Sequence, residues 1–197
     1  MEHIIYYFDI IQIIISRFYY NLRMYFRCKI RGVNIKGGSQ FYGMTVFRKK
    51  LRSQINIGKM CRFRSNPASN LIGINRPCII STHLEEANLN IGNNCGFSGT
   101  VIGCFKEITL GNNVMCGANT LITDSDWHLD DKRTGEPKQI LINDNVWLGV
   151  NSVVLKGVTI GKNSVIGANS LVVNDIPSNV IAGGNPCKVL RKLHISK

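Results

Sequence analysis

The sequence predicts an all-β fold, a parallel β-helix of hexapeptide repeats, preceded by one amphipathic α-helix. Three observations support this: an aliphatic residue recurs every six positions, small or turn-forming residues often follow it, and helical spacing of apolar residues is confined to the N-terminal segment. A period of six matches neither an α-helix, with about 3.6 residues per turn, nor the two-residue alternation of a strand. Each unit supplies a short strand and a turn, and three units make one coil of a triangular prism.

The repeat is most regular over residues 142–172. The in-frame aliphatic residues there are Ile142, Leu148, Val154, Ile160, Ile166 and Val172. Upstream, the same frame contains Ile57, Phe63, Ile91, Phe97, Leu110, Cys116 and Ile122. One extra residue lies between Phe97 and Leu110. When coils stack, these residues form buried columns. A single six-residue unit is too small to bury them.

The N-terminal segment predicts a helix with a broad apolar stripe. Its apolar residues at helical spacing are Ile4, Phe8, Ile11, Ile15, Phe18, Leu22 and Phe26. Asp9 and Gln12 interrupt the apolar runs, which argues against a transmembrane span. Two interpretations stay open. The helix caps the open end of the prism, or residues 1–27 make peripheral contact with the inner face of a membrane. We therefore expect a helical segment over 1–30, a β-helix over 31–192 and a basic tail over 193–197.

Positive charge is concentrated at the front of the chain. The net charge is +12, and residues 1–60 hold eleven lysines and arginines against two acids. An anionic partner fits this distribution: phospholipid, a pyrophosphate-linked substrate or the phosphates of coenzyme A. No nucleic-acid-binding motif accompanies the charge. Seven scattered cysteines without a C-x-x-C pair predict free thiols in a reducing, cytoplasmic environment.

A polar segment, residues 123–139, interrupts the repeat and contains His128. Function in a regular solenoid usually resides in such an excursion. A neutral imidazole can accept the proton of a sugar hydroxyl as that hydroxyl attacks a carbonyl group. The sequence therefore predicts that His128 is the candidate general base.

Four segments of the C-terminal half resemble a known superfamily: VWLG at 146–149, GVTIG at 157–161, VIGA at 165–168 and AGGNPCKV at 182–189. Residues 55–192 resemble the left-handed β-helix acyltransferases, especially the galactoside, maltose and capsule-sugar O-acetyltransferases. This resemblance implies acetyl-coenzyme A as donor, a saccharide hydroxyl as acceptor, no metal, and a homotrimer with active sites between subunits.

The resemblance also implies roles for individual residues. Asp126-Trp-His128 matches a D-x-H arrangement in which the histidine is the catalytic base, and Asp126, Asp124 or a backbone carbonyl holds its second ring nitrogen. The implied cofactor-binding residues are Trp147, Gly149, Lys162, Gly167, Ala168, Asn185, Pro186, Lys188 and Arg191. The candidate acceptor contacts are Ser98, Asn119, Asp124 and Trp127.

Alternative functions remain on the same fold. An N-acetyltransferase acting on an amino sugar, or an antibiotic acetyltransferase, uses the same groove and a similar histidine. A zinc hydratase of the γ-carbonic anhydrase type needs three histidine ligands, and only His83 and His128 lie within the repeat region. A β-helix that only binds ligands would consume no thioester and would tolerate loss of His128.

Overall fold

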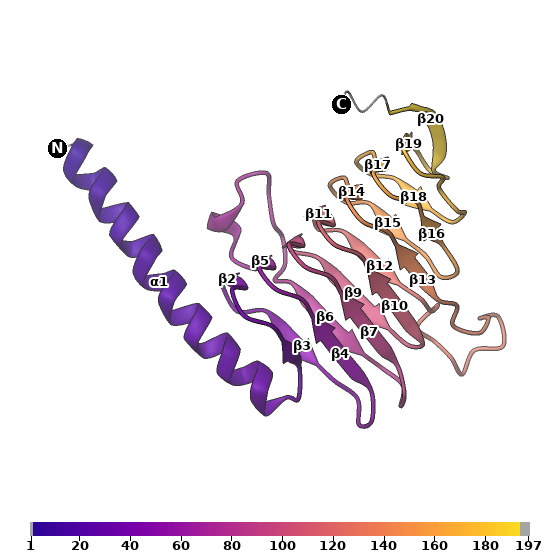
Figure 1. Cartoon of the computed structure of the whole chain (residues 1–197), viewed down its shortest axis with the longest axis horizontal. Coiled ribbons are helices and arrows are strands. Elements are labelled where there is room, and N and C mark those ends of the chain that lie inside the picture. Colours follow the sequence, from indigo (N-terminus) through magenta and orange to yellow (C-terminus); the bar gives the residue numbers. More distant parts are fainter. Residues whose placement is uncertain (1, 194–197) are drawn as a thin grey trace.

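The computed structural model describes residues 2–193, without the side chains of residues 2–6, 8–10 and 13. Figure 1 shows one long helix, α1 (Glu2–Ile30), lying across the end of a prism of stacked coils. The fold is a left-handed parallel β-helix with an N-terminal α-helix, as predicted. Residues 194–197, most of the predicted basic tail, lie outside the described residues.

Three sheets form the walls of the prism, and each coil contributes one strand to each wall in turn. The first sheet contains β1 (Asn34–Ile35), β4 (Gln54–Ile57), β7 (Asn88–Ile91), β10 (Glu107–Leu110), β13 (Ile140–Ile142) and β16 (Thr159–Ile160). The second contains β2 (Gln40–Tyr42), β5 (Arg62–Arg64), β8 (Gly96–Ser98), β11 (Met115–Ala118), β14 (Trp147–Leu148), β17 (Val165–Ile166), β19 (Val180–Gly183) and the antiparallel β20 (Lys188–Lys192). The third contains β3 (Val46–Arg48), β6 (Ile79–Thr82), β9 (Val101–Cys104), β12 (Leu121–Thr123), β15 (Val153–Val154) and β18 (Leu171–Val172).

The register stacks in-frame residues into buried columns. The column of the second sheet contains Phe41, Phe63, Phe97, Cys116, Leu148, Ile166 and Ala182. Its three phenylalanine rings stack with centroid separations of 5.0 Å. The predicted frame is confirmed from Ile57 to Val172, and the coils extend upstream to β1. All seven cysteines are buried free thiols.

Asparagine makes many of the turns between walls. Asn145, Asn163 and Asn179 have φ values of 60°, 60° and 59°, a left-handed conformation that most L-residues avoid. Their amides bond along the prism, from Asn145 to Asn163 at 3.0 Å and from Asn163 to Asn179 at 2.7 Å. The side chain that tolerates this turn therefore also links one coil to the next.

Helix α1 covers the first coil with one face only. Met24 and Cys28 are fully buried in the core, and Asn21 Oδ1 accepts a 2.7 Å hydrogen bond from the Phe41 backbone N–H. That bond satisfies the Phe41 N–H on β2, the edge strand of the second sheet. The inner face of α1 therefore caps the open end of the prism. The opposite face exposes large apolar residues, namely Ile11, Ile15, Phe18, Leu22 and Phe26. The cap therefore leaves the membrane interpretation open for the outer face.

Two loops leave the prism. Loop 65–78, which contains the 3-10 helix η1 (Pro67–Ser69), connects β5 to β6 at the edge between the second and third sheets. Loop 124–139 connects β12 to β13 at the edge between the third and first sheets. The sequence predicted the second loop and not the first. Figure 1 shows them on different sides of the prism.

Candidate active site

Asp124 anchors the beginning of loop 124–139. Its side chain is fully buried, and its carboxylate accepts backbone N–H bonds from Phe105, Lys106 and Glu107 at 2.6, 2.7 and 2.8 Å. Three N–H donors are a strong set for one buried carboxylate. Asp124 was expected to contact the acceptor or to hold the His128 ring. In the structure this buried carboxylate bonds to the backbone N–H groups that fix the loop, and its contact with the acceptor stays a prediction.

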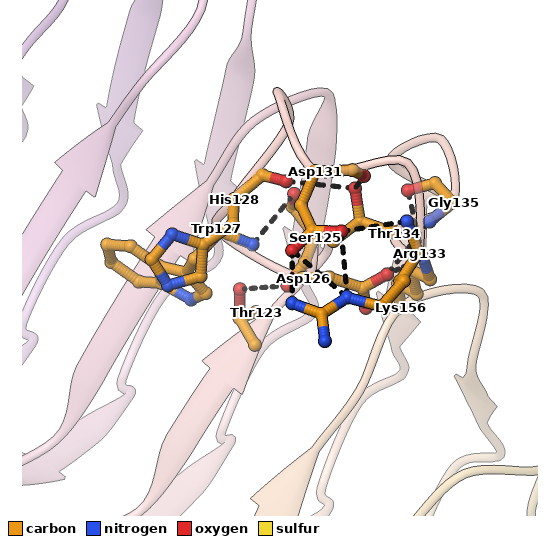
Figure 2. A network of polar contacts seen from close by, with 10 residues as sticks. All are labelled: Thr123, Ser125, Asp126, Trp127, His128, Asp131, Arg133, Thr134, Gly135 and Lys156. Carbon is orange, nitrogen blue, oxygen red and sulfur yellow. Dashed lines mark hydrogen bonds and ion pairs between the residues drawn. The ribbon is translucent and has the colours of Figure 1, made fainter.

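Asp126 closes the neck of the loop, as Figure 2 shows. Its Oδ2 accepts hydrogen bonds from Lys156 Nζ at 2.5 Å and from the Gly135 N–H at 3.0 Å, and Lys156 also donates to the Gly135 carbonyl at 2.9 Å. The bond from Lys156, and then that from Gly135, lower the pKa of Asp126 below its ordinary value. Asp126 was expected to act on His128. Its described partners are Lys156 and Gly135, which hold the loop, and its action on His128 stays a prediction.

His128 follows these two anchors along the loop, between Asp126 and Gly135, and its side chain is exposed. Its N–H donates to the Asp126 carbonyl at 2.9 Å, and its own carbonyl accepts from the Asp131 N–H at 3.1 Å and from Thr134 Oγ1 at 2.9 Å. These bonds fix the backbone and leave the imidazole accessible (Figure 2). The arrangement presents a potential proton acceptor on a rigid support.

Trp127 packs against two aromatic rings from neighbouring coils. Its ring lies 4.7 Å from the His83 ring and 5.3 Å from the Phe105 ring, and His83 stacks on Phe105 at 4.5 Å. A Cβ atom at Gly103 would approach Trp127 Cζ2 to 2.5 Å, so the absence of a side chain there makes room for the indole. Trp127 keeps 42% of its surface exposed. It therefore remains available to a ligand beside His128.

Burial lowers the pKa of His83 below its ordinary value, against the opposing effect of the Asp124 charge. His83 Nε2 lies 2.8 Å from Ser81 Oγ. The sequence did not place His83 and Phe105 in this cluster because the repeat is irregular around Ile102. The strand register could have placed them. Ile80, Ile102 and Ile122 stack on one another, so His83 and Phe105, three residues after Ile80 and Ile102, lie at the edge where loop 124–139 begins.

Ser98 and Asn119 were expected to contact the acceptor, and these two contacts stay predictions. Each is 7% exposed. Ser98 Oγ accepts a 3.0 Å bond from Asn70 Nδ2, whereas Asn119 bonds to the Asn75 N–H at 3.1 Å and to the Gly73 carbonyl at 2.9 Å. Both side chains hold loop 65–78 against the prism. Ser98 was expected to face outward because this loop, which covers it, was not predicted.

The cofactor-binding residues implied by the resemblance lie mostly along another edge. Gly149, Gly167 and Ala168 follow β14 and β17, at the turns between the second and third sheets. A Cβ at Gly149 would lie 2.6 Å from the Ala168 backbone N, whereas one at Gly167 would meet nothing closer than 3.5 Å. Stacking of the coils therefore requires the first glycine, whereas a Cβ atom at the second would make ordinary van der Waals contacts.

The remaining candidates are at or near the surface of the prism. Trp147, on β14, is 58% exposed, and Lys162 lies at the turn between the first and second sheets. Asn185 and Pro186 form a cis peptide bond between β19 and β20, and Lys188 and Arg191 are exposed on β20.

One chain does not bring the predicted base and the predicted cofactor residues together. His128 belongs to the edge between the third and first sheets, whereas Gly149, Gly167 and Ala168 belong to the edge between the second and third. Parallel strands stack along the prism, so residues on different edges stay separated by a whole wall. The described residues therefore supply the parts of a site at two edges.

The family model described as bacterial transferase hexapeptide (six repeats) matches residues 140–174. The galactoside O-acetyltransferase of Lactococcus lactis subsp. lactis (strain IL1403) is 49% identical over 94 residues, covering 46% of this chain and 45% of that protein. Over this region the chain is similar to hexapeptide-repeat acetyltransferases. A second relative, the galactoside O-acetyltransferase of Escherichia coli (strain K12), is 40% identical over 114 residues, covering 55% of this chain and 56% of that protein. The chain spans about half the length of the curated relatives it matches.

A solved structure supports the fold. A point mutant of AntD, an N-acyltransferase from Bacillus cereus in complex with dTDP-4-amino-4,6-dideoxyglucose and coenzyme A, matches with a TM-score of 0.62 at 16% identity. The match covers 86% of this chain and 89% of that chain. At 16% identity this match supports a shared fold only.

Two searches of the described residues bear on other classes of site. Within residues 2–193, no group of three His, Cys, Asp or Glu side chains is arranged to hold a metal ion. None of the described helices, α1 included, meets the combined requirement of length and apolar character for crossing a bilayer.

Proposed function

We propose that this protein is an O-acetyltransferase that moves an acetyl group from acetyl-coenzyme A to a hydroxyl of a saccharide. The observation that carries the proposal is the exposed His128 on a loop fixed at both ends by Asp124 and by the Asp126–Lys156 ion pair. The 40–49% identity to galactoside O-acetyltransferases supports the reaction class.

The proposed reaction is a direct transfer. Neutral His128 accepts the hydroxyl proton, and the acceptor oxygen forms a bond to the thioester carbonyl carbon. Backbone N–H groups stabilise the resulting oxyanion. The carbon–sulfur bond then breaks, and the imidazolium returns its proton to the coenzyme A thiolate. Trp127, still 42% exposed beside His128, offers an aromatic surface to the sugar ring.

Acetyl-coenzyme A is proposed to lie along the edge that carries Gly149, Gly167 and Ala168. The small residues Gly167 and Ala168 let the amides of pantetheine approach the main chain. Trp147 borders the acetyl end in this proposal. The exposed cations Lys162, Lys188 and Arg191 suit the phosphates, and Asn185-Pro186 suits the adenine end.

We also propose that two copies share each site, within a homotrimer. The base and the proposed groove lie on different edges of one prism, so a second copy is needed to bring them face to face. A cyclic trimer repeats such a heterologous contact three times and closes. Each copy then contributes His128 to one site and its groove to another.

Peripheral membrane contact is proposed for the outer face of α1. Its exposed side chains Ile11, Ile15, Phe18 and Leu22 form an apolar stripe that no described residue covers. A helix of this kind lies in the interface of an anionic bilayer, with basic residues at the headgroups. This interaction would deliver the enzyme to membrane-bound saccharide precursors at the inner membrane face.

The deciding experiment measures thiol release from acetyl-coenzyme A with a panel of saccharides. We expect the His128→Ala variant to lose about 10²–10⁴-fold in kcat, because a positioned general base contributes this much. Lys132→Ala, an exposed substitution in the same loop, is the matched control and should retain full activity. Saccharide-dependent release that survives His128→Ala would refute the assigned base. The absence of coenzyme A binding would refute the proposed function.

A further inference from the structure

A cavity of about 250 Å³ lies between α1, the first two coils and loop 65–78. Its walls include Arg17 and Tyr20 from the helix, Tyr42 and Arg64 from β2 and β5, and Asn66 and Ser69 from the loop. The mechanism proposed above uses none of these residues. Two guanidinium groups, two phenol rings and two small polar side chains therefore surround one space.

The two arginines differ in how they are held. The Arg64 guanidinium carbon lies 4.9 Å from the centre of the Tyr42 ring, and one guanidinium nitrogen donates to the Ser69 carbonyl. Arg64 therefore has a fixed position and retains donors for a ligand. No described residue pairs with the guanidinium of Arg17. One arginine is preorganised and the other is available to close on a bound group.

Among the described residues, no acidic side chain lines this cavity. The stretch between Asp9 and Glu85 contains fourteen lysines and arginines and no aspartate or glutamate. A cavity with two arginines in such a region favours an anion. Guanidinium groups match the oxygen pairs of phosphate through parallel N–H bonds, and the remaining donors bind a second phosphoryl group.

The cavity also has an informative place on the prism. Asn66 follows β5, so this wall of the cavity is at the edge between the second and third sheets. Farther along, the same edge carries Gly149 after β14 and Gly167 after β17; Figure 1 shows the order of these strands. Strands β8 and β11 separate β5 from β14, a distance of about 14 Å at roughly 4.8 Å per strand. Loop 65–78 covers the turns after β8 and β11, so the cavity and the proposed acetyl-coenzyme A groove lie on either side of this loop.

We propose that this cavity binds the phosphate or diphosphate group of a saccharide acceptor, with Arg17 and Arg64 as its ligands. The inference rests on the proposed function, because it assigns the acceptor to the class of phosphate-linked sugars. Arg17 and Arg64 are binding residues and take no part in the proton transfer by His128.

The first test measures binding of inorganic pyrophosphate to the full chain by calorimetry. We expect Arg17→Gln and Arg64→Gln each to weaken the affinity about tenfold, the effect of losing one charge-assisted interaction. Arg62→Gln is the matched control, because it removes the same charge two residues away on β5, outside the cavity. We expect it to change the affinity less than about twofold. Equal weakening by all three variants, or no binding to the wild type, would overturn the proposal.

Arg17→Gln keeps the test decisive even if Arg64→Gln disturbs loop 65–78, because the Arg17 guanidinium has no described partner to lose. A melting temperature equal to that of the wild type verifies this. The pyrophosphate measurement needs no acetyl transfer, so its outcome is separate from that of the proposed function.

The second test distinguishes the source of the phosphate. With a sugar diphosphate as acceptor, we expect Arg17→Gln to raise KM for the acceptor about tenfold and to leave KM for acetyl-coenzyme A unchanged. With the unphosphorylated sugar, the variant should equal the wild type. If Arg17→Gln instead weakens binding to phosphatidylglycerol vesicles and leaves both acceptor KM values unchanged, the phosphate is that of a lipid headgroup and the acceptor assignment is wrong.

Discussion

Asp124 illustrates how one side chain sets the geometry of the candidate site. Its buried carboxylate accepts three backbone N–H groups from the segment after β9, and loop 124–139 begins at this residue. Because the donors belong to the preceding coil, Asp124 ties the loop to the prism. The exposed His128 acquires its position from this buried anchor.

Asp124→Asn should destabilise the protein by roughly 3 kcal/mol, because the neutral amide is a weaker acceptor and directs N–H groups toward backbone donors. Denaturant titration measures the change in the free energy of unfolding. Asp130→Asn makes the same chemical change at an exposed position in the same loop and should alter stability by less than about 0.5 kcal/mol. Equal effects of the two substitutions would contradict the anchoring role.

His83 should make stability depend on pH. Burial lowers its pKa in the folded state below the ordinary value of 6.5. The unfolded chain therefore binds a proton at a higher pH than the folded chain does. The contribution of His83 is fully present above pH 6.5 and is lost as the pH falls through the lowered pKa.

His83→Phe preserves a ring for stacking on Phe105 and removes this titration. We expect the melting temperature of the variant to fall less than that of the wild type between pH 6.5 and pH 5, with other acid-sensitive groups acting on both proteins alike. Parallel pH profiles would show that His83 does not contribute through its protonation.

Helix α1 is an element with two functional faces. The inner face buries Met24 and Cys28 and satisfies the Phe41 N–H through Asn21. The outer face exposes Phe18, Leu22 and Phe26 at 71%, 66% and 65%. Capping the prism explains the first face and does not explain the second.

Two substitutions on α1 separate these faces. Met24→Ala removes a fully buried side chain and should cost about 3 kcal/mol in unfolding free energy. Leu22→Ala removes an exposed one and should cost less than about 0.5 kcal/mol while weakening binding to anionic vesicles. Flotation with phosphatidylglycerol vesicles measures the second effect. Unchanged binding of Leu22→Ala and Phe18→Ala would argue against the membrane interpretation.

At the scale of the whole molecule, the distribution of parts over separate edges is the main consequence of the fold. The loop with His128 projects from one edge, and the small residues of the proposed groove lie on another. A solenoid keeps its edges apart along its whole length. The proposed site therefore requires contact between copies.

Mixed oligomers test this consequence. Ala168→Trp should block the groove at an exposed position, and His128→Ala removes the base. Each variant alone should be inactive, whereas co-assembly in equal amounts should restore about one quarter of the activity, because this fraction of interfaces in a cyclic oligomer pairs two intact halves. Activity of the same mixture should remain absent if both residues serve a site within one chain.

The sequence by itself determined the β-helix, its frame from Ile57 to Val172, the N-terminal helix and the loop with His128. These features are readable because the six-residue period is local, and each unit displays its buried and turn positions in order. The tertiary structure decided what Asp124, Ser98 and Asn119 do. Each is polar in the sequence, yet each is buried beneath a loop whose path depends on neighbouring coils.

The tertiary structure also decided which distant residues meet. Arg17 and Arg64 share a cavity, and His83, Phe105 and Trp127 share a cluster, although each set spans more than forty residues of chain. Insertions of variable length between strands hide this proximity in the sequence. Stacking restores it, because hydrogen-bonded register aligns each coil on the one before it regardless of the chain length between them.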